Sequence, residues 1–246
     1  MSKATISPKN ERILHTKSGN RCAICQIPLV ELNGNKTVCI GENAHIYGEK
    51  KTAARYNENL PEEFVNSEKN LIFLCCNCHT KIDRNEDDYS VDKLLEIKAK
   101  HEKWVYDSLS KANSEFGFAE LEVLANYLIK KRPNNNGDFD YDIISINEKI
   151  DKNSLNDVSD EIMMGLTRCK TIEDYCNRHP DTSFSKTLTN IMAMKYSELK
   201  VLHNDSIEIF YLLWDFASGY NNDWNYKAAG LSIVTYFFEK CEVFEK

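Results

Sequence analysis

The sequence predicts an α+β protein of two units, in which a small zinc-bound domain is followed by an all-helical domain. Two Cys-x-x-Cys pairs, Cys22 with Cys25 and Cys75 with Cys78, lie beside short apolar runs of strand type. Later in the chain the apolar residues recur at helical spacing. Residues 132–138 are dense in turn formers and separate the two patterns.

Composition limits the class of protein. The chain has 246 residues, 42% hydrophobic content and a formal net charge of -7, which suits one or two globular domains. No stretch approaches the roughly 18 uncharged apolar residues of a membrane-spanning helix, and the start lacks the apolar region of a signal peptide. We therefore expect a cytoplasmic protein without a membrane partner. In that reducing compartment, nine cysteines indicate metal ligands and free thiols instead of disulfides.

Charge is distributed unevenly along the chain. Up to Lys111 there are 17 Lys and Arg against 16 Asp and Glu, whereas the remainder has 14 against 22. An acidic surface repels phosphate backbones, so we expect any nucleic-acid contact to lie in the first unit. From composition, the metal-binding domain is predicted over residues 1–112, a connector helix and linker over 113–139, and the helical domain over 140–246.

The elements of the first unit follow from its local patterns. Gly19 and Asn20 are expected to stop the first helix and deliver the first cysteine pair on a tight turn. The expected elements, in chain order, are a helix over residues 10–18, strands over 38–40 and 71–74, a helix that opens near Cys78 and runs past Asp83, and a longer helix capped by Ser90.

The two cysteine pairs carry the strongest signal in the chain. Four thiolates on two such turns are an efficient tetrahedral site for structural Zn²⁺, so Cys22, Cys25, Cys75 and Cys78 are the predicted ligands. Cys76 is the alternative register, although it would leave only one residue before Cys78. The other interpretation is that these are ordinary buried cysteines, but two pairs rarely coincide by chance.

Two histidines lie close to this cluster in sequence. His45 follows an apolar run and precedes a polar loop, where a histidine is either structural or faces a substrate. His79 directly follows the last predicted zinc ligand, four residues before Asp83, so the two share one helix face. An imidazole and a carboxylate at this spacing can hold a second metal ion, while the plainer alternative for Asp83 is a salt bridge or a solvated surface.

These residues resemble the HNH endonuclease family and its ββα-metal motif. His45 in Ala-His-Ile corresponds to the base histidine of the first strand, Asn70 to the asparagine before the second strand, and His79 to the metal-binding histidine of the helix. The four cysteines correspond to the structural zinc of one branch of the family. The resemblance covers roughly residues 8–110 and implies a metal-dependent nuclease.

One position departs from the family pattern. Many members carry an acidic metal ligand immediately before the base histidine, and this chain has Ala44 there. The resemblance then implies a catalytic Mg²⁺ or Mn²⁺ held by His79, with oxygen from Asp83 or Asn70 and water completing the shell. Arg55 is predicted to clamp a phosphate bidentately, with a solvated loop arginine as the alternative.

The implied chemistry is hydrolysis of a phosphodiester bond in DNA. His45 takes a proton from water, the hydroxide attacks the phosphorus in line, and a divalent ion stabilises the developing charge. RNA as substrate stays open, because phosphodiester chemistry does not identify the sugar. The alternative from another class is a non-catalytic zinc module that binds nucleic acid or protein, with His45 in a structural role.

The second unit is predicted to be all-helical and to carry no catalytic constellation. Helices are expected around residues 158–166, 188–199, 207–216 and 228–238. The aromatic residues near the last two are interpreted chiefly as core, with an interaction surface as the alternative; they are Trp214, Tyr220, Trp224 and Tyr226. Cys169, Cys176 and Cys241 lack partner spacing and are expected to be inert.

Residues 140–245 resemble the C-terminal domain of effector subunits from ABC-three-component, Lamassu-like bacterial antiphage defence systems. The residues that carry this resemblance are Ile-Asn-Glu-Lys-Ile at 146–150 and the Phe-Phe-Glu-x-Cys-Glu-Val-Phe ending. It implies an SMC-like ATPase and a small adaptor subunit as partners, with the nuclease inactive until foreign DNA is sensed. Self-assembly of the released effector into a homo-oligomer would be one way to activate it.

Overall fold

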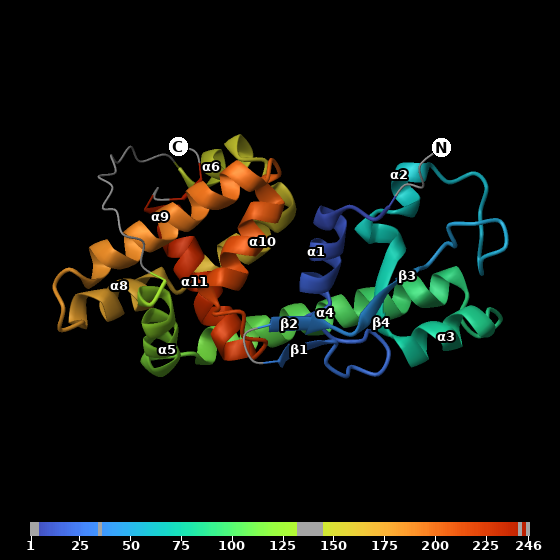
Figure 1. Cartoon of the computed structure of the whole chain (residues 1–246), viewed down its shortest axis with the longest axis horizontal. Helices are drawn as coiled ribbons and strands as arrows, with labels where there is room; N and C mark the ends of the chain where they lie inside the picture. Colours follow the sequence, from blue (N-terminus) through green and yellow to red (C-terminus); the bar gives the residue numbers. More distant parts are fainter. Residues whose placement is uncertain (1–4, 34–35, 132–144, 241–242, 245–246) are drawn as a thin grey trace. The chain divides into compact units, whose positions relative to one another are not determined.

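The computed structural model divides the chain into two compact units, Met1–Asp107 and Ser108–Lys246, each described here by itself (Figure 1). The described residues are 5–33, 36–131, 145–240 and 243–244. The predicted linker at 132–138 and the cysteine at 241 lie outside them.

The first unit combines two strand pairs with short helices. Strand β1 pairs with β2 and β3 pairs with β4, both antiparallel. In chain order the elements are α1 (Pro8–Lys17), β1 (Val30–Asn33), β2 (Lys36–Cys39), β3 (Gly41–His45), α2 (Glu62–Val65), the 3-10 turn η1 (Glu68–Asn70), β4 (Leu71–Cys75), α3 (Cys76–Arg84) and α4 (Val91–Glu115), which runs on into the second unit.

Strand β4 forms the centre of this unit. All five of its residues are buried, since β3 pairs along it and both α1 and α3 pack against it. Burial on every side explains its continuous apolar sequence, in contrast to the alternation of a half-exposed strand. At the opposite strand, a Cβ on Gly41 would lie 2.4 Å from ring atoms of Phe73, so only glycine fits there.

Helix α1 forms where a helix over residues 10–18 was predicted, but it begins two residues earlier, at Pro8, and ends at Lys17. The Ser7 hydroxyl accepts a hydrogen bond from the Asn10 amide at 3.1 Å, and Pro8 occupies the first turn. Gly19 and Asn20 take left-handed φ values of 60° and 58°, which stop the helix. The predicted strand over 71–74 and the helix capped by Ser90 also form, with Ser90 accepting from the Lys93 amide at 3.3 Å.

The strands that lead up to His45 were predicted only in part. Of the predicted strand over residues 38–40, Val38 and Cys39 form the end of β2, and Ile40 lies between β2 and β3. The β1–β2 hairpin was not predicted. Strand β3 is mostly polar because it is covered chiefly by β4 and leaves Glu42 exposed. An apolar run is therefore a poor guide to a strand buried on one side.

The second unit is all-helical in its described part, as predicted. Its remaining elements are α5 (Phe118–Ile129), α6 (Ile146–Lys152), the 3-10 turn η2 (Asn156–Val158), α7 (Ser159–Leu166), α8 (Cys169–Arg178), α9 (Phe184–Leu202), α10 (Ser206–Ala217) and α11 (Trp224–Glu239). No described helix is long and apolar enough to cross a membrane.

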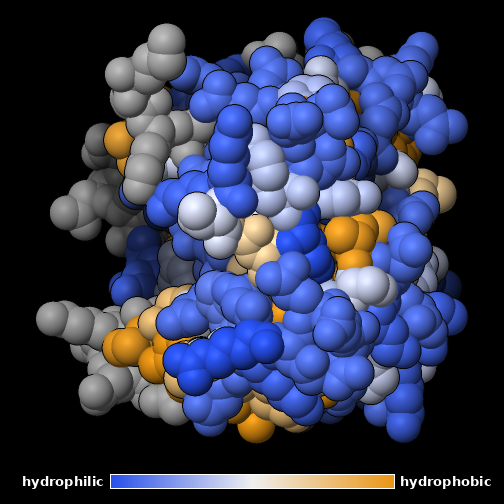
Figure 2. Space-filling view, turned by 90° about the vertical axis from the view of Figure 1, so that its right-hand side faces the viewer, coloured by the Kyte–Doolittle hydropathy of each residue, from blue (hydrophilic) through white to orange (hydrophobic). Residues whose placement is uncertain are grey.

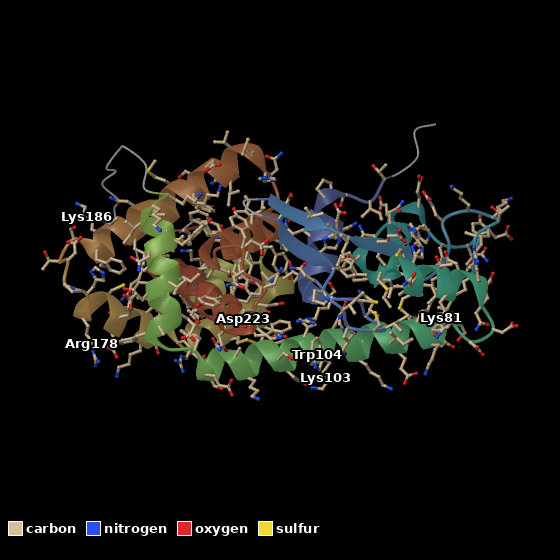
Figure 3. All side chains as sticks on the ribbon, turned by 60° about the horizontal axis from the view of Figure 1, so that its bottom comes forward. Lys81, Lys103, Trp104, Arg178, Lys186 and Asp223 are labelled. Atoms are coloured by element: carbon tan, nitrogen blue, oxygen red, sulfur yellow. The ribbon has the colours of Figure 1, made fainter. Side chains whose placement is uncertain are left out.

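Helix α11 is the core of the second unit. Its residues from 227 to 238 are all buried, and α5, α7, α8, α9 and α10 pack around it. It begins at Asp223, whose carboxylate accepts a hydrogen bond from the Asn225 amide at 2.9 Å (Figure 3). At the closest crossing, a Cβ on Gly165 would lie 2.6 Å from the Thr235 hydroxyl, so α7 can approach only through glycine.

The structure places the aromatic residues and two of the cysteines that the sequence singled out in the second unit. Trp214 is 6% exposed and its indole Nε1 donates to the Lys227 carbonyl at 2.8 Å, which makes it a core residue; Tyr220, in contrast, is 43% exposed. Burial raises the pKa of Cys169 to about 12 and that of Cys176 to about 11, so both thiols stay protonated at neutral pH.

The buried histidine of α4 gives the first unit a pH dependence. His101 is 4% exposed, donates from Nε2 to the Ser18 carbonyl at 2.9 Å and stacks on Trp104, which Figure 3 labels. Burial lowers its pKa below the usual 6.5, so the unfolded chain takes up a proton at a higher pH than the folded chain. The stability due to neutral His101 is present above pH 6.5 and falls as the pH drops below it.

We therefore expect the melting temperature of the natural chain to fall when the pH is lowered from 7.5 to 5.5. The melting temperature of the His101→Gln variant should fall less over the same interval. Thermal unfolding at several pH values measures both slopes, and His203→Gln, at a half-exposed histidine of the second unit, is the control. Equal slopes for the natural chain and His101→Gln would contradict this role.

Candidate functional site

The four predicted zinc ligands converge at one point in the first unit. The Sγ atoms of Cys22, Cys25, Cys75 and Cys78 all lie within 4.8 Å of one another, and those of Cys25 and Cys75 are 3.7 Å apart. Tetrahedral zinc with Zn–S bonds of about 2.3 Å needs sulfur atoms about 3.8 Å apart. The cluster therefore has the ligand type and the spacing of a structural zinc site.

Each cysteine pair is presented by a defined local structure. The first pair lies on a turn in which the Gln26 amide donates to the Cys22 carbonyl at 2.8 Å, with Gln26 at a left-handed φ of 60°. The second pair is formed where β4 passes directly into α3. There Cys75 is the N-cap, and its sulfur accepts from the Cys78 amide at 3.4 Å.

The charge balance of the cluster also favours a cation. Burial and the neighbouring thiols of Cys75 and Cys22 raise the pKa of the Cys78 thiol, so the four groups cannot all ionise without positive charge among them. Cys76, the alternative register, is exposed, and its sulfur points toward the Asn77 side chain at 3.9 Å. The structure thus assigns Cys75, not Cys76, to the cluster.

His45 is the last residue of β3 and is half-buried. Its Nε2 lies 3.0 Å from the Oδ1 atom of Asn66, a buried residue that follows α2. Because an amide oxygen only accepts hydrogen bonds, Nε2 carries the hydrogen of the neutral ring, and Nδ1 is the basic nitrogen. Asn66 was not identified from the sequence, where no pattern marks it.

Asn70 lies immediately before β4 and is 1% exposed. Its Oδ1 accepts from the Tyr47 amide at 2.9 Å, and its Nδ2 donates to the carbonyls of Tyr47 at 3.0 Å and Val65 at 2.9 Å. The side chain therefore joins the segment after His45 to the segment before β4. In this structure it holds the polypeptide around the histidine, and metal ligation by Asn70 stays a prediction.

His79 lies in the first half of α3 between two carboxylates. Its Nδ1 is 2.7 Å from Glu42 Oε2 on β3, and its Nε2 is 3.3 Å from Asp83 Oδ2, one helical turn away. The predicted pairing of His79 with Asp83 is therefore present as a contact. Glu42 was not identified from the sequence, although strand alternation puts it on the same side of β3 as Ala44.

The side chain of Arg55 is 5% exposed and bonded on several sides. Nε donates to the Ile46 carbonyl at 2.8 Å, and Nη1 donates to the Ile82 carbonyl at 2.7 Å. Nη2 donates to Asp83 Oδ1 at 3.1 Å. Arg55 thus ties the segment after His45 to α3 and orients Asp83, while the phosphate contact predicted for it would require these bonds to be exchanged.

Hydrophilic residues dominate one face of the molecule. The face in Figure 2, which is the right-hand side of Figure 1, is mainly hydrophilic with isolated hydrophobic residues. Helix α3 also carries Lys81, which Figure 3 labels and whose Nζ lies 5.6 Å from the centre of the Tyr89 ring. A polar, mixed-charge surface of this kind suits a charged partner better than an apolar one.

Comparisons with known families agree with this geometry. Residues 22–86, which contain the four cysteines, His45, Asn70 and His79, match the HNH endonuclease family, so this part of the chain is an HNH endonuclease domain. Residues 105–244, more than half of the chain, match C-terminal domain 11 of the ABC-three component (ABC-3C) systems. The chain belongs to this ABC-3C family, and both predicted resemblances are confirmed at this level. No curated protein matches the chain.

The cluster generates a prediction with a control in the adjacent residue. Cys75→Ser removes a zinc ligand and should release the metal and unfold the first unit, because zinc contributes roughly 10–16 kcal/mol in small metal-bound folds. Cys76 is adjacent in sequence but exposed, so the Cys76→Ser variant should keep its zinc and its fold. Elemental analysis and circular dichroism report metal content and folding, and full zinc content in Cys75→Ser would contradict the assignment.

Proposed function

We propose that this chain is a metal-dependent HNH endonuclease that hydrolyses phosphodiester bonds in DNA, as the effector of an ABC-3C antiphage defence system. The observation that carries the proposal is that the HNH-matched residues contain both a histidine whose ring is held by a hydrogen bond, His45, and a histidine between two carboxylates, His79. The functional division we propose is a nuclease domain in residues 1–112, a connector in 113–139 and a regulatory helical domain in 140–246.

His45 is the proposed general base. The hydrogen bond from Nε2 to Asn66 fixes the tautomer, which leaves the lone pair of Nδ1 to accept a proton from the attacking water. Asn70 supports this arrangement indirectly, because its three bonds to main-chain atoms hold the segment that follows His45. Such positioned proton transfer typically contributes about 10²- to 10⁴-fold in rate.

His79 is the proposed ligand of a catalytic Mg²⁺ or Mn²⁺ ion. Two carboxylates flank it and one guanidinium faces them, so the group has the excess negative charge that a cation requires. When bound, such an ion stabilises the charge that develops on the phosphate and the leaving oxygen. Arg55 contributes by holding Asp83 against His79.

Membership of the ABC-3C family implies partner components for the helical unit. We propose an SMC-like ATPase and a small adaptor of a Lamassu-like system, which would keep the nuclease inactive until foreign DNA is sensed and then allow self-assembly. The charge distribution supports this division, since the acidic second half repels DNA and suits protein partners better.

A second candidate function is a non-catalytic zinc module that binds nucleic acid or protein. The specific observation in its favour is Ala44, which is fully buried where many relatives carry an acidic metal ligand. In that case the domain would bind only its structural zinc and no catalytic ion, and His45 would be a structural residue.

His45→Ala separates the two functions. We expect the variant to keep its zinc and its fold but to lose plasmid cleavage by at least about 10²-fold, the contribution of a general base. Cleavage should be measured with Mg²⁺ or Mn²⁺, for the isolated chain and together with its ABC-3C partners, on both DNA and RNA. His203→Ala, in the second unit, is the matched control. Full activity of His45→Ala would exclude the proposed mechanism.

Asn66 provides a finer test of the same base. Asn66→Ala removes the acceptor of the Nε2 hydrogen, so the ring loses its fixed orientation and kcat should fall about tenfold. Because Asn66 is buried and has no assigned contact with substrate, KM should stay close to that of the natural chain. A rise in KM with unchanged kcat would assign Asn66 to substrate binding instead.

A further inference from the structure

Helix α1 lies outside the residues that match the HNH family, but it contacts the surroundings of His45. The family match begins at residue 22, whereas α1 ends at Lys17. The helix packs against β4 and against the 3-10 turn η1 (Figure 1). If His45 is the general base of the proposed endonuclease, on which this inference rests, the polar contacts of α1 bear on catalysis. Three side chains of α1 make them, and they are Asn10, Glu11 and His15.

Asn10 holds the main chain of Asn66, the residue that accepts the hydrogen bond of His45. Asn10 Nδ2 donates to the Asn66 carbonyl at 2.9 Å, and Asn66 Oδ1 lies 3.0 Å from His45 Nε2. The preceding carbonyl, that of Val65, accepts from Asn70 Nδ2 at 2.9 Å. The peptide units on either side of the Asn66 Cα atom are therefore both held by side chains. Together these bonds fix the direction in which the Asn66 side chain leaves the main chain.

The other two contacts of α1 hold the strand that carries His45. Asn43 Oδ1 accepts from His15 Nε2 at 2.8 Å, and Asn43 Nδ2 donates to Glu11 Oε1 at 2.9 Å. Glu11 and His15 are one helical turn apart, so both reach the same amide group. Asn43 lies two residues before His45 and on the same side of β3. Helix α1 thus holds both β3 and the residue that orients the imidazole.

The side chain of Asn10 contributes little to α1 itself. The helix begins after Ser7, whose hydroxyl accepts from the main-chain amide of Asn10, and asparagine favours a helix less than alanine does. The Asn10 side chain is bonded instead to a residue 56 positions later in the sequence. A substitution at this position therefore removes the bond to Asn66 and leaves the start of the helix intact.

We propose that Asn10 is a positioning residue for the base His45, which it orients through Asn66, and that α1 is a functional part of the nuclease site. Without the bond from Asn10, the Asn66 main chain can turn, and Oδ1 no longer fixes the Nε2 hydrogen of His45. The Nδ1 lone pair then faces the attacking water for a smaller fraction of the time. The expected loss in kcat is about 2- to 10-fold, the equivalent of one net hydrogen bond.

The test is a double-mutant cycle on the full chain, assayed for plasmid cleavage with Mg²⁺ in the presence of its ABC-3C partners. Asn10→Ala should lower kcat about 2- to 10-fold and leave KM close to that of the natural chain. Because Asn10 acts through Asn66, the variant with both Asn10→Ala and Asn66→Ala should be no slower than Asn66→Ala alone. Lys17→Ala, at the last residue of the same helix, is the control and should cleave like the natural chain.

The orientation of the His45 ring can be measured without cleavage. In a chain labelled with ¹⁵N-histidine, long-range proton–nitrogen NMR correlations identify the tautomer, and His45→Ala assigns the signals. The natural chain should carry the His45 hydrogen on Nε2, protected from exchange with water, and Asn10→Ala should lose this protection. Asn10→Asp should do the same, because a carboxylate in the first turn favours the helix but cannot donate to the Asn66 carbonyl. Zinc content and thermal melting show that each variant is folded.

The outcomes separate this inference from the proposed function. An unchanged kcat and an unchanged His45 signal in Asn10→Ala would overturn the role of Asn10, while loss of cleavage in His45→Ala would still support the endonuclease. A double variant that is slower than Asn66→Ala by the full effect of Asn10→Ala would also overturn it, because residues that act independently have additive effects. Full cleavage by His45→Ala would reject the base itself, and this inference with it.

Discussion

The four-cysteine cluster is the constraint on which the first unit depends. It joins the turn after α1 to the junction of β4 and α3, two segments separated by nearly fifty residues. Cys75 has two roles, because it is both a member of the cluster and the N-cap of α3. The register that pairs Gly41 with Cys75 and His45 with Leu71 then sets how far His45 lies from the cluster.

Two groups of polar contacts lie around the strands and helices that the cluster joins. At the end of β3, Asn66 holds the imidazole of His45, and Asn70 holds the main chain that follows it. On α3, His79 lies between Glu42 and Asp83, and the buried Arg55 ties that group back to the segment after His45. The helical unit has a different construction, around a central α11 that α7 approaches through Gly165. Its family membership connects the nuclease domain to a multi-component system.

Prediction from the sequence succeeded where a residue type and its spacing are sufficient. The four clustered cysteines, the buried strand β4 and the helices α7, α9, α10 and α11 carry local patterns that predicted them. Helices α6 and α8 were not predicted. It was less successful for β3, because a strand covered mainly on one side has no apolar run. Arg55 illustrates the same limit, since a loop arginine gives no sign in the sequence that it is buried.

By itself, the sequence determined the class of protein, the four cysteines of the metal cluster, and the two histidines that carry the proposed chemistry. Only the tertiary structure decided which neighbours act on those histidines. Asn66 lies 21 residues from His45, and Glu42 lies 37 residues from His79. Contacts over such separations depend on strand register and helix packing, which bring side chains together without leaving a local pattern.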